Sequence, residues 1–138
     1  MKYFIPIIFF ILISCADKVT QQDLQQLNGY WDIDKVESVD KKVTKYGANS
    51  TIDFYFVNEQ NEGYRKKTTL DFSGTYKTNN IKDKIVIEDK NGAFIIKTIT
   101  SLDNWEEVII SLTKEKLVLK NEKGVLFYYN KHEKFNSN

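Results

Sequence analysis

The sequence has few of the residues that build cross-linked, metal-bound or catalytic sites. Its 138 residues include one cysteine, Cys15, one histidine, His132, and one proline, Pro6. A lone cysteine excludes a disulfide within the chain, and one histidine with one cysteine is too small a ligand set for zinc. Val, Ile, Thr, Tyr and Phe are abundant, which is typical of β-strands. The fold must therefore depend on an apolar core.

A strong charge of one sign is also lacking. The chain has 20 basic and 19 acidic side chains, and this balance gives no basic surface for nucleic acid. The one dense basic cluster is Arg65-Lys66-Lys67. We interpret it as the solvated face of a strand, with contact to an anionic ligand or a lipid headgroup as the alternative.

The one long apolar run lies directly before Cys15. Lys2 precedes the apolar stretch 4–13, which is too short to span a bilayer and fits the apolar region of a signal peptide. Leu12-Ile13-Ser14-Cys15 resembles the lipobox of a bacterial lipoprotein. The resemblance implies cleavage before Cys15 and acylation of its thiol, for example with palmitate, which would hold the protein on a membrane. The alternatives are an ordinary secretory signal with an incidental cysteine and an N-terminal membrane anchor.

These features divide the chain into four parts. We expect a signal peptide over 1–14, a lipidated cysteine with a polar tether and short helix over 15–26, a β-barrel over 27–132, and a flexible tail over 133–138. Removal of the signal leaves 124 of the 138 residues, enough for one domain. Ala16 stands where enteric inner-membrane lipoproteins have aspartate, which favours the outer membrane, facing the periplasm or the surface.

Alternating apolar residues predict eight strands after Gly29. Thr20 and Asp23 form a capping-box pattern for the preceding helix over 20–27, and Asn91-Gly92 is a hairpin signal. Ser73-Gly74 indicates a bend inside one strand. The expected strands are 30–39, 50–57, 64–78, 84–88, 93–100, 105–112, 116–120 and 125–131.

Eight short strands with short connections favour an all-β, antiparallel up-and-down barrel, because closure removes exposed sheet edges. Such an interior is filled by side chains or holds one small ligand. A transmembrane barrel is excluded because charged residues occupy outward positions that lipid would require to be apolar. These positions are Asp53, Lys84, Glu88 and Lys97.

Leu27-Asn28-Gly29-Tyr30-Trp31 resembles the Gly-x-Trp motif of lipocalins, in which the tryptophan closes the barrel floor. Phe72-Ser73-Gly74-Thr75-Tyr76 and the paired segments 117–119 and 126–129 are similar to elements of lipocalin-like lipoproteins of Bacteroidetes. The resemblance covers 27–132 and implies that Gly29 and Trp31 are fold-determining residues. The chain lacks the Thr-Asp-Tyr type loop of true lipocalins and an arginine to stack on Trp31, a role in which Lys131 is the expected substitute.

No arrangement of residues predicts catalysis. His132 lies in a tail rich in Lys and Glu, where an imidazole is not held in register. Asp32 and Asp34 share the solvent face of one strand, whereas the adjacent Glu106 and Glu107 point to opposite faces. We therefore expect a protein that is not an enzyme and has no cofactor and no metal.

The barrel interior is the remaining candidate site. We expect Phe54, Phe56, Phe72, Ile110 and Phe127 to line it, although bulky residues of this kind equally fill a packed core. A pocket predicts a lipid-anchored carrier of a small hydrophobic ligand. A packed core predicts a non-catalytic envelope interaction module, such as an accessory subunit or an inhibitor. The module would present the segments 46–49, 58–63 and 64–67 to its protein partner.

The lipobox generates the first prediction. A Cys15→Ala variant should remain folded but leave the membrane fraction, because two or three acyl chains, at about 0.8 kcal/mol for each buried CH₂, provide the attachment. Fractionation of cells with immunodetection measures this. A Cys15→Ala variant that still sediments with membranes would contradict both the lipidation and the localisation.

Overall fold

The computed structural model describes residues 18–47 and 51–133, so the expected signal peptide, Cys15, Ala16 and most of the expected tail lie outside the described residues. One 3₁₀ helix, η1 (Gln22–Leu27), precedes the strands. The strands are β1 (Gly29–Glu37), β2 (Val43–Lys45), β3 (Thr51–Val57), β4 (Glu62–Leu70), β5 (Tyr76–Thr78), β6 (Asp83–Lys90), β7 (Ala93–Ile99), β8 (Asn104–Leu112), β9 (Lys116–Asn121) and β10 (Leu126–Lys131).

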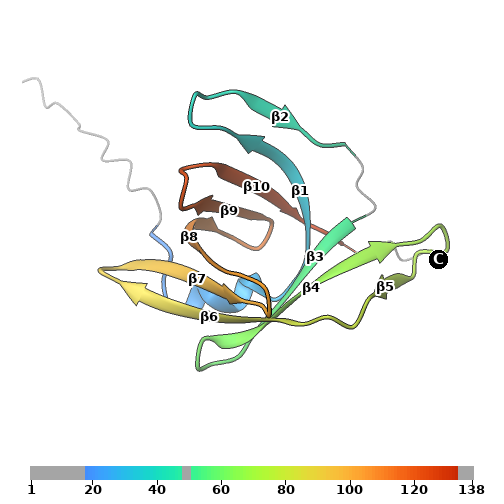
Figure 1. Ribbon diagram of the computed structural model, residues 1–138, viewed down its shortest axis with the longest axis horizontal. Coiled ribbons are helices and arrows are strands. Elements are labelled where there is room, and N and C mark those ends of the chain that lie inside the picture. The colour runs from blue at the N-terminus through green and yellow to red at the C-terminus, as the bar shows by residue number, and fades with distance from the viewer. Residues whose placement is uncertain (1–17, 48–50, 134–138) are drawn as a thin grey trace, which may run out of the picture.

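The strands form one antiparallel sheet that closes on itself (Figure 1). The order is β10-β9-β8-β7-β6-β4-β3-β1, and pairing of β1 with β10 completes the ring. The short strands β2 and β5 add to β1 and β4 outside this path. The expected eight-stranded antiparallel barrel is therefore confirmed.

Local sequence explains where the strands end. Asn91 and Gly92 both have positive φ, at 55° and 87°, as the Asn-Gly hairpin signal requires. The expected bend at Ser73-Gly74 is a full turn that separates β4 from β5, with Gly74 at φ 81°. Strand β2 was not expected. Its three residues show no alternation of apolar and polar side chains that would predict a strand, and all three are exposed in the structure.

Helix η1 covers one end of the barrel. Thr20 and Asp23 bond to each other as the capping-box pattern predicts, with the Thr20 amide donating to Asp23 Oδ2 at 2.8 Å. Leu24 and Leu27 are completely buried. Trp31 is also completely buried and donates from Nε1 to the Leu27 carbonyl at 2.8 Å, which joins the helix to β1.

Lys131 takes the expected position over Trp31. Its Nζ lies 4.5 Å from the ring centroid, and it donates to the carbonyls of Gln26 and Asn28. Gly29 leaves the space that this lysine needs, because a Cβ at Gly29 would lie 2.8 Å from Lys131 Nζ. Burial lowers the pKa of Lys131. The Gly-x-Trp segment is thus a floor made by a tryptophan, a lysine and a helix end.

Gly63 generates a stability prediction, because the backbone of β3 lies directly where a side chain at this position would be. A Cβ at Gly63 would lie 1.7 Å from the backbone oxygen of Phe56, whereas a Cβ at Gly47 would contact nothing within 4 Å. Gly63→Ala should therefore lower the free energy of unfolding by about 3 kcal/mol, a large overpacking effect. Gly47→Ala is the matched control and should change it by less than about 0.5 kcal/mol. Equal urea midpoints for the two variants would contradict this account of the β3–β4 contact.

Candidate ligand-binding cavity

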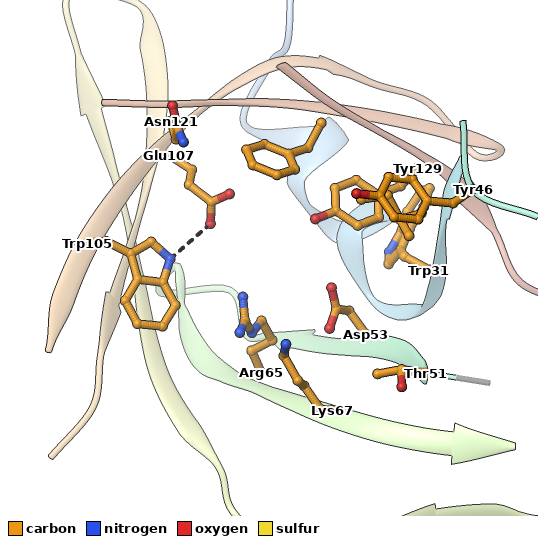
Figure 2. Close-up of a pocket in the computed structure, with 12 residues that line it drawn as sticks. Trp31, Tyr46, Thr51, Asp53, Arg65, Lys67, Trp105, Glu107, Asn121 and Tyr129 are labelled. Atoms are coloured by element: carbon orange, nitrogen blue, oxygen red, sulfur yellow. Dashed lines mark hydrogen bonds between the residues drawn. The ribbon is translucent and has the colours of Figure 1, made fainter. Parts of the chain in front are cut away.

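A cavity of about 490 Å³ lies inside the barrel next to Trp31 (Figure 2). This volume falls in the usual range for small-molecule sites. The ladder between β1 and β3 ends at Trp31, and β2 then replaces β3 beside Lys35–Glu37. Tyr46, just after β2, and Thr51, at the start of β3, both line the cavity. The interior is therefore not filled where these strands diverge.

One part of the wall is apolar and mostly aromatic. Its residues come from neighbouring strands, where Ile33 on β1 pairs with Tyr129 on β10 and Phe127 on β10 pairs with Leu119 on β9. The large side chains that line the cavity are Trp31, Ile33, Tyr46, Trp105, Phe127 and Tyr129. These flat surfaces suit a flat apolar molecule.

Four charged side chains complete the wall: Asp53 on β3, Arg65 and Lys67 on β4, and Glu107 on β8. Asp53 and Lys67 are cross-strand partners, so both project from the same face of the sheet. Figure 2 shows the ends of Asp53, Arg65 and Glu107 directed into the space between the strands. Two acids and two bases therefore face the same cavity.

Arg65 is largely buried, with 13% of its side chain exposed. Its guanidinium lies 3.8 Å from an Asp83 carboxylate oxygen and 5.3 Å from the centroid of the Trp105 ring. Its Nε is buried and has no hydrogen-bond partner among the described residues. A buried donor without a partner is rare in folded proteins, because leaving it unpaired costs about 1–3 kcal/mol.

The two carboxyls are also incompletely paired. The Asp53 carboxylate makes no hydrogen bond or ion pair with the described residues, and burial raises its pKa against the opposing effect of Arg65 and Lys67. Glu107 accepts one hydrogen bond, from Trp105 Nε1 at 3.2 Å. Burial raises the pKa of Glu107 as well, while this bond and Arg65 oppose the shift. Both carboxylates therefore have free lone pairs toward the cavity.

Of the five residues expected to line the interior, only Phe127 lines the cavity. The prediction is wrong for Phe54 and Phe56, because Tyr55 and Val57 are the buried inward residues of β3. Phe54 instead packs on Tyr30 outside the barrel, with ring centroids 4.8 Å apart.

The prediction is also wrong for Phe72 and Ile110. Phe72 is fully exposed in the turn after β4, where Asp71 accepts hydrogen bonds from Ser73 and Thr75 and thereby lowers its own pKa to about 2. Ile110 is 48% exposed because a bulge between Ile109 and Ser111 shifts the register of β8.

The charged residues of the cavity correct two further expectations. Asp53 was expected on the outward face, but it points inward with Tyr55. The basic cluster was interpreted as one solvated face, yet alternation along β4 directs Arg65 and Lys67 toward the cavity, where Arg65 is largely buried and Lys67 stays exposed to solvent. Lys66 faces outward, over the Tyr64 ring at 5.3 Å. The available signal was the i, i+2 spacing of the two inward cations.

His132 is held firmly, contrary to the expectation of a tail out of register. Its Nδ1 lies 2.5 Å from Asp32 Oδ2, and its backbone amide donates to the Tyr30 carbonyl. Its Nε2 is buried and meets no hydrogen-bond partner among the described residues, so no hydroxyl is placed for activation there. The pair fastens the end of β10 to β1.

Glu106 and Glu107 do point to opposite faces, as expected. Glu106 pairs outside the barrel with Lys97 at 3.5 Å, and Glu107 lies inside. No three His, Cys, Asp or Glu side chains gather as metal ligands within the part of the chain that the structure describes. Over the same residues, no helix has the length and apolar character to cross a membrane.

The comparisons with known proteins support the fold. The sequence matches no protein-family model and no curated protein. The crystal structure of a lipocalin-like protein from Bacteroides uniformis ATCC 8492 is similar, with a TM-score of 0.50 and 14% identity over 78% of this chain and 99% of that chain. An uncharacterized protein from Bacteroides eggerthii DSM 20697 aligns with a TM-score of 0.48 and 15% identity over 77% and 99%. The fold is a lipocalin-like closed antiparallel β-barrel.

The raised pKa values generate a pH prediction. An acid whose pKa is raised by folding stabilises the fold while protonated, and this contribution is lost as the pH rises through the folded-state pKa. Asp53→Asn/Glu107→Gln should therefore gain stability relative to the unaltered protein as the pH rises above the ordinary carboxyl pKa of about 4, because the variant has no carboxyls to ionise there. Thermal unfolding across this range measures the difference. The control, Glu122→Gln, removes an exposed carboxyl outside the cavity, and a similar trend there would contradict the assignment.

Proposed function

We propose that this protein is a lipid-anchored envelope lipoprotein whose lipocalin-like barrel binds one small amphipathic molecule and does not convert it. The observation that carries the proposal is the cavity of about 490 Å³, whose wall includes the unpaired Nε of Arg65 and the unpaired carboxylate of Asp53. A barrel selected for stability alone would fill this space or pair these groups, because unpaired buried charge destabilises a fold.

The composition of the wall argues against a purely hydrophobic ligand. An alkane-like molecule would exclude water from Asp53, Arg65, Lys67 and Glu107 without replacing its hydrogen bonds. A ligand with an apolar body and a polar end meets both parts of the wall. We therefore revise the expected hydrophobic ligand to an amphipathic one.

The start of the described chain is consistent with attachment through Cys15. Gln21 bonds to Asn61 in the β3–β4 turn, and Lys18 lies beside Gly92 in the β6–β7 turn. Both turns lie at the end of the barrel that η1 covers. An anchor there would hold the closed end toward the membrane, and we propose the outer membrane because of Ala16.

A second candidate function, the envelope interaction module, is favoured by Phe72. This side chain is fully exposed at the tip of a turn that Asp71 organises, which presents an aromatic group to a partner in a fixed position. If the barrel neither retains nor binds a small molecule, the interaction module becomes the better-supported of the two functions.

Ligand binding is tested with a variant whose larger side chain occupies part of the cavity. Ile33→Trp adds bulk to the wall, and Ile110→Trp adds the same bulk on the exposed outer face. Native mass spectrometry of protein purified from envelopes should show one retained small molecule in the unaltered chain and in Ile110→Trp, and at least about tenfold less in Ile33→Trp. Thermal unfolding must show that Ile33→Trp is folded. Retention that is equal in both variants, or absent in the unaltered chain, would contradict the proposal.

A further inference from the structure

The signs of the charged side chains restrict the class of ligand, given the proposed function. Asp53 and Lys67 face each other across the β3–β4 ladder, and Glu107 lies on β8 beside Trp105. The two bases on β4 therefore lie between the acid on β3 and the acid on β8, so the wall as a whole does not carry a single sign.

Ligands of a single charge leave part of this wall without partners. A simple anion would pair with Arg65 and Lys67 but would desolvate Asp53 and Glu107 and repel them. A simple cation would produce the reverse. Two unit charges about 4 Å apart interact by about 4 kcal/mol at an effective dielectric constant near 20, so such mismatches decide affinity.

We propose that the ligand is amphoteric: it presents an acidic group to Arg65 and Lys67, a protonated amine or N–H group to Asp53 and Glu107, and a flat apolar body to the aromatic wall. The body lies against Trp105, Phe127 and Tyr129, which are flat and rigid surfaces. Every charged group of the cavity then has a partner.

The two halves of the ligand do not contribute equally. Arg65 already has a partner in Asp83 at 3.8 Å, whereas Asp53 has none among the described residues. The amine of the ligand therefore satisfies the larger deficit. Loss of the amine should weaken binding more than loss of the acid.

Four molecules with one indole body separate these contributions: tryptophan, tryptamine, indole-3-propionate and 3-methylindole. Isothermal titration calorimetry with delipidated protein should give affinities in that order, with about tenfold, or about 1.4 kcal/mol, between tryptophan and tryptamine. If 3-methylindole or indole-3-propionate binds as tightly as tryptophan or more tightly, the amphoteric class is overturned.

Charge-removing variants show whether the named residues are responsible. Lys67→Gln should weaken tryptophan and indole-3-propionate about tenfold and leave tryptamine unchanged. Asp53→Asn should weaken tryptophan and tryptamine and leave indole-3-propionate unchanged. The control is Lys66→Gln, which removes the neighbouring outward lysine and should change none of them. A Lys67→Gln variant that weakens all four probes equally would contradict the assignment.

The outcomes distinguish this inference from the function on which it rests. Protein that retains a small molecule in native mass spectrometry but binds none of the four probes overturns the amphoteric aromatic class alone. Protein that retains nothing and binds none of the probes overturns the binding function itself.

Discussion

The pairing of β1 with β10 is the interaction on which the rest of the structure depends. It closes the sheet, and its register places Trp31 opposite Lys131 and Ile33 opposite Tyr129. The same pairing brings the ammonium of Lys131 over Trp31 and against the carbonyls that end η1. Closure, the barrel floor and one wall of the cavity therefore have a single origin.

The cavity exists because two other ladders are short. The last β1–β3 pair joins Trp31 to Asp53, and the last β4–β6 pair joins Arg65 to Asp83. Beyond these pairs, β1 and β4 pair with the short strands β2 and β5. Asp53 and Arg65 thus occur where these ladders stop, and Glu107 reaches the same cavity from within the β7–β8 ladder.

The fold was predictable from the sequence because alternation and turn residues act locally. Asn91-Gly92 and the Thr20–Asp23 pair each produce the expected local structure, whereas Ser73-Gly74 marks the correct position but forms a full turn instead of a bend. The inward face of β3 was not predictable, because Thr51–Val57 has apolar or aromatic residues at both parities. Only pairing with Trp31 and Arg65 across the ladders selects Asp53 and Tyr55 for the interior.

The register of β8 depends on a β-bulge, and no residue type in this strand predicts one. The bulge beside Ile110 reverses the parity within β8, so that Glu107 and Ile109 point inward before it and Leu112 after it. Apolar residues at both parities made Val108 and Ile110 seem equally good inward residues. The cavity therefore could not be assembled from strand patterns taken one at a time.

Stability and binding make opposite demands on this interior. Burial raises the pKa values of Asp53 and Glu107, which means that the ionised carboxylates destabilise the empty barrel relative to the unfolded chain. Neutral residues at these positions would favour the fold, but they would remove the groups that we propose to contact the amine of the ligand. The proposed ligand would offset this penalty, because a ligand that binds only the folded state stabilises it. The incompletely paired carboxyls of Asp53 and Glu107 therefore support the proposed ligand more strongly than the size of the cavity does.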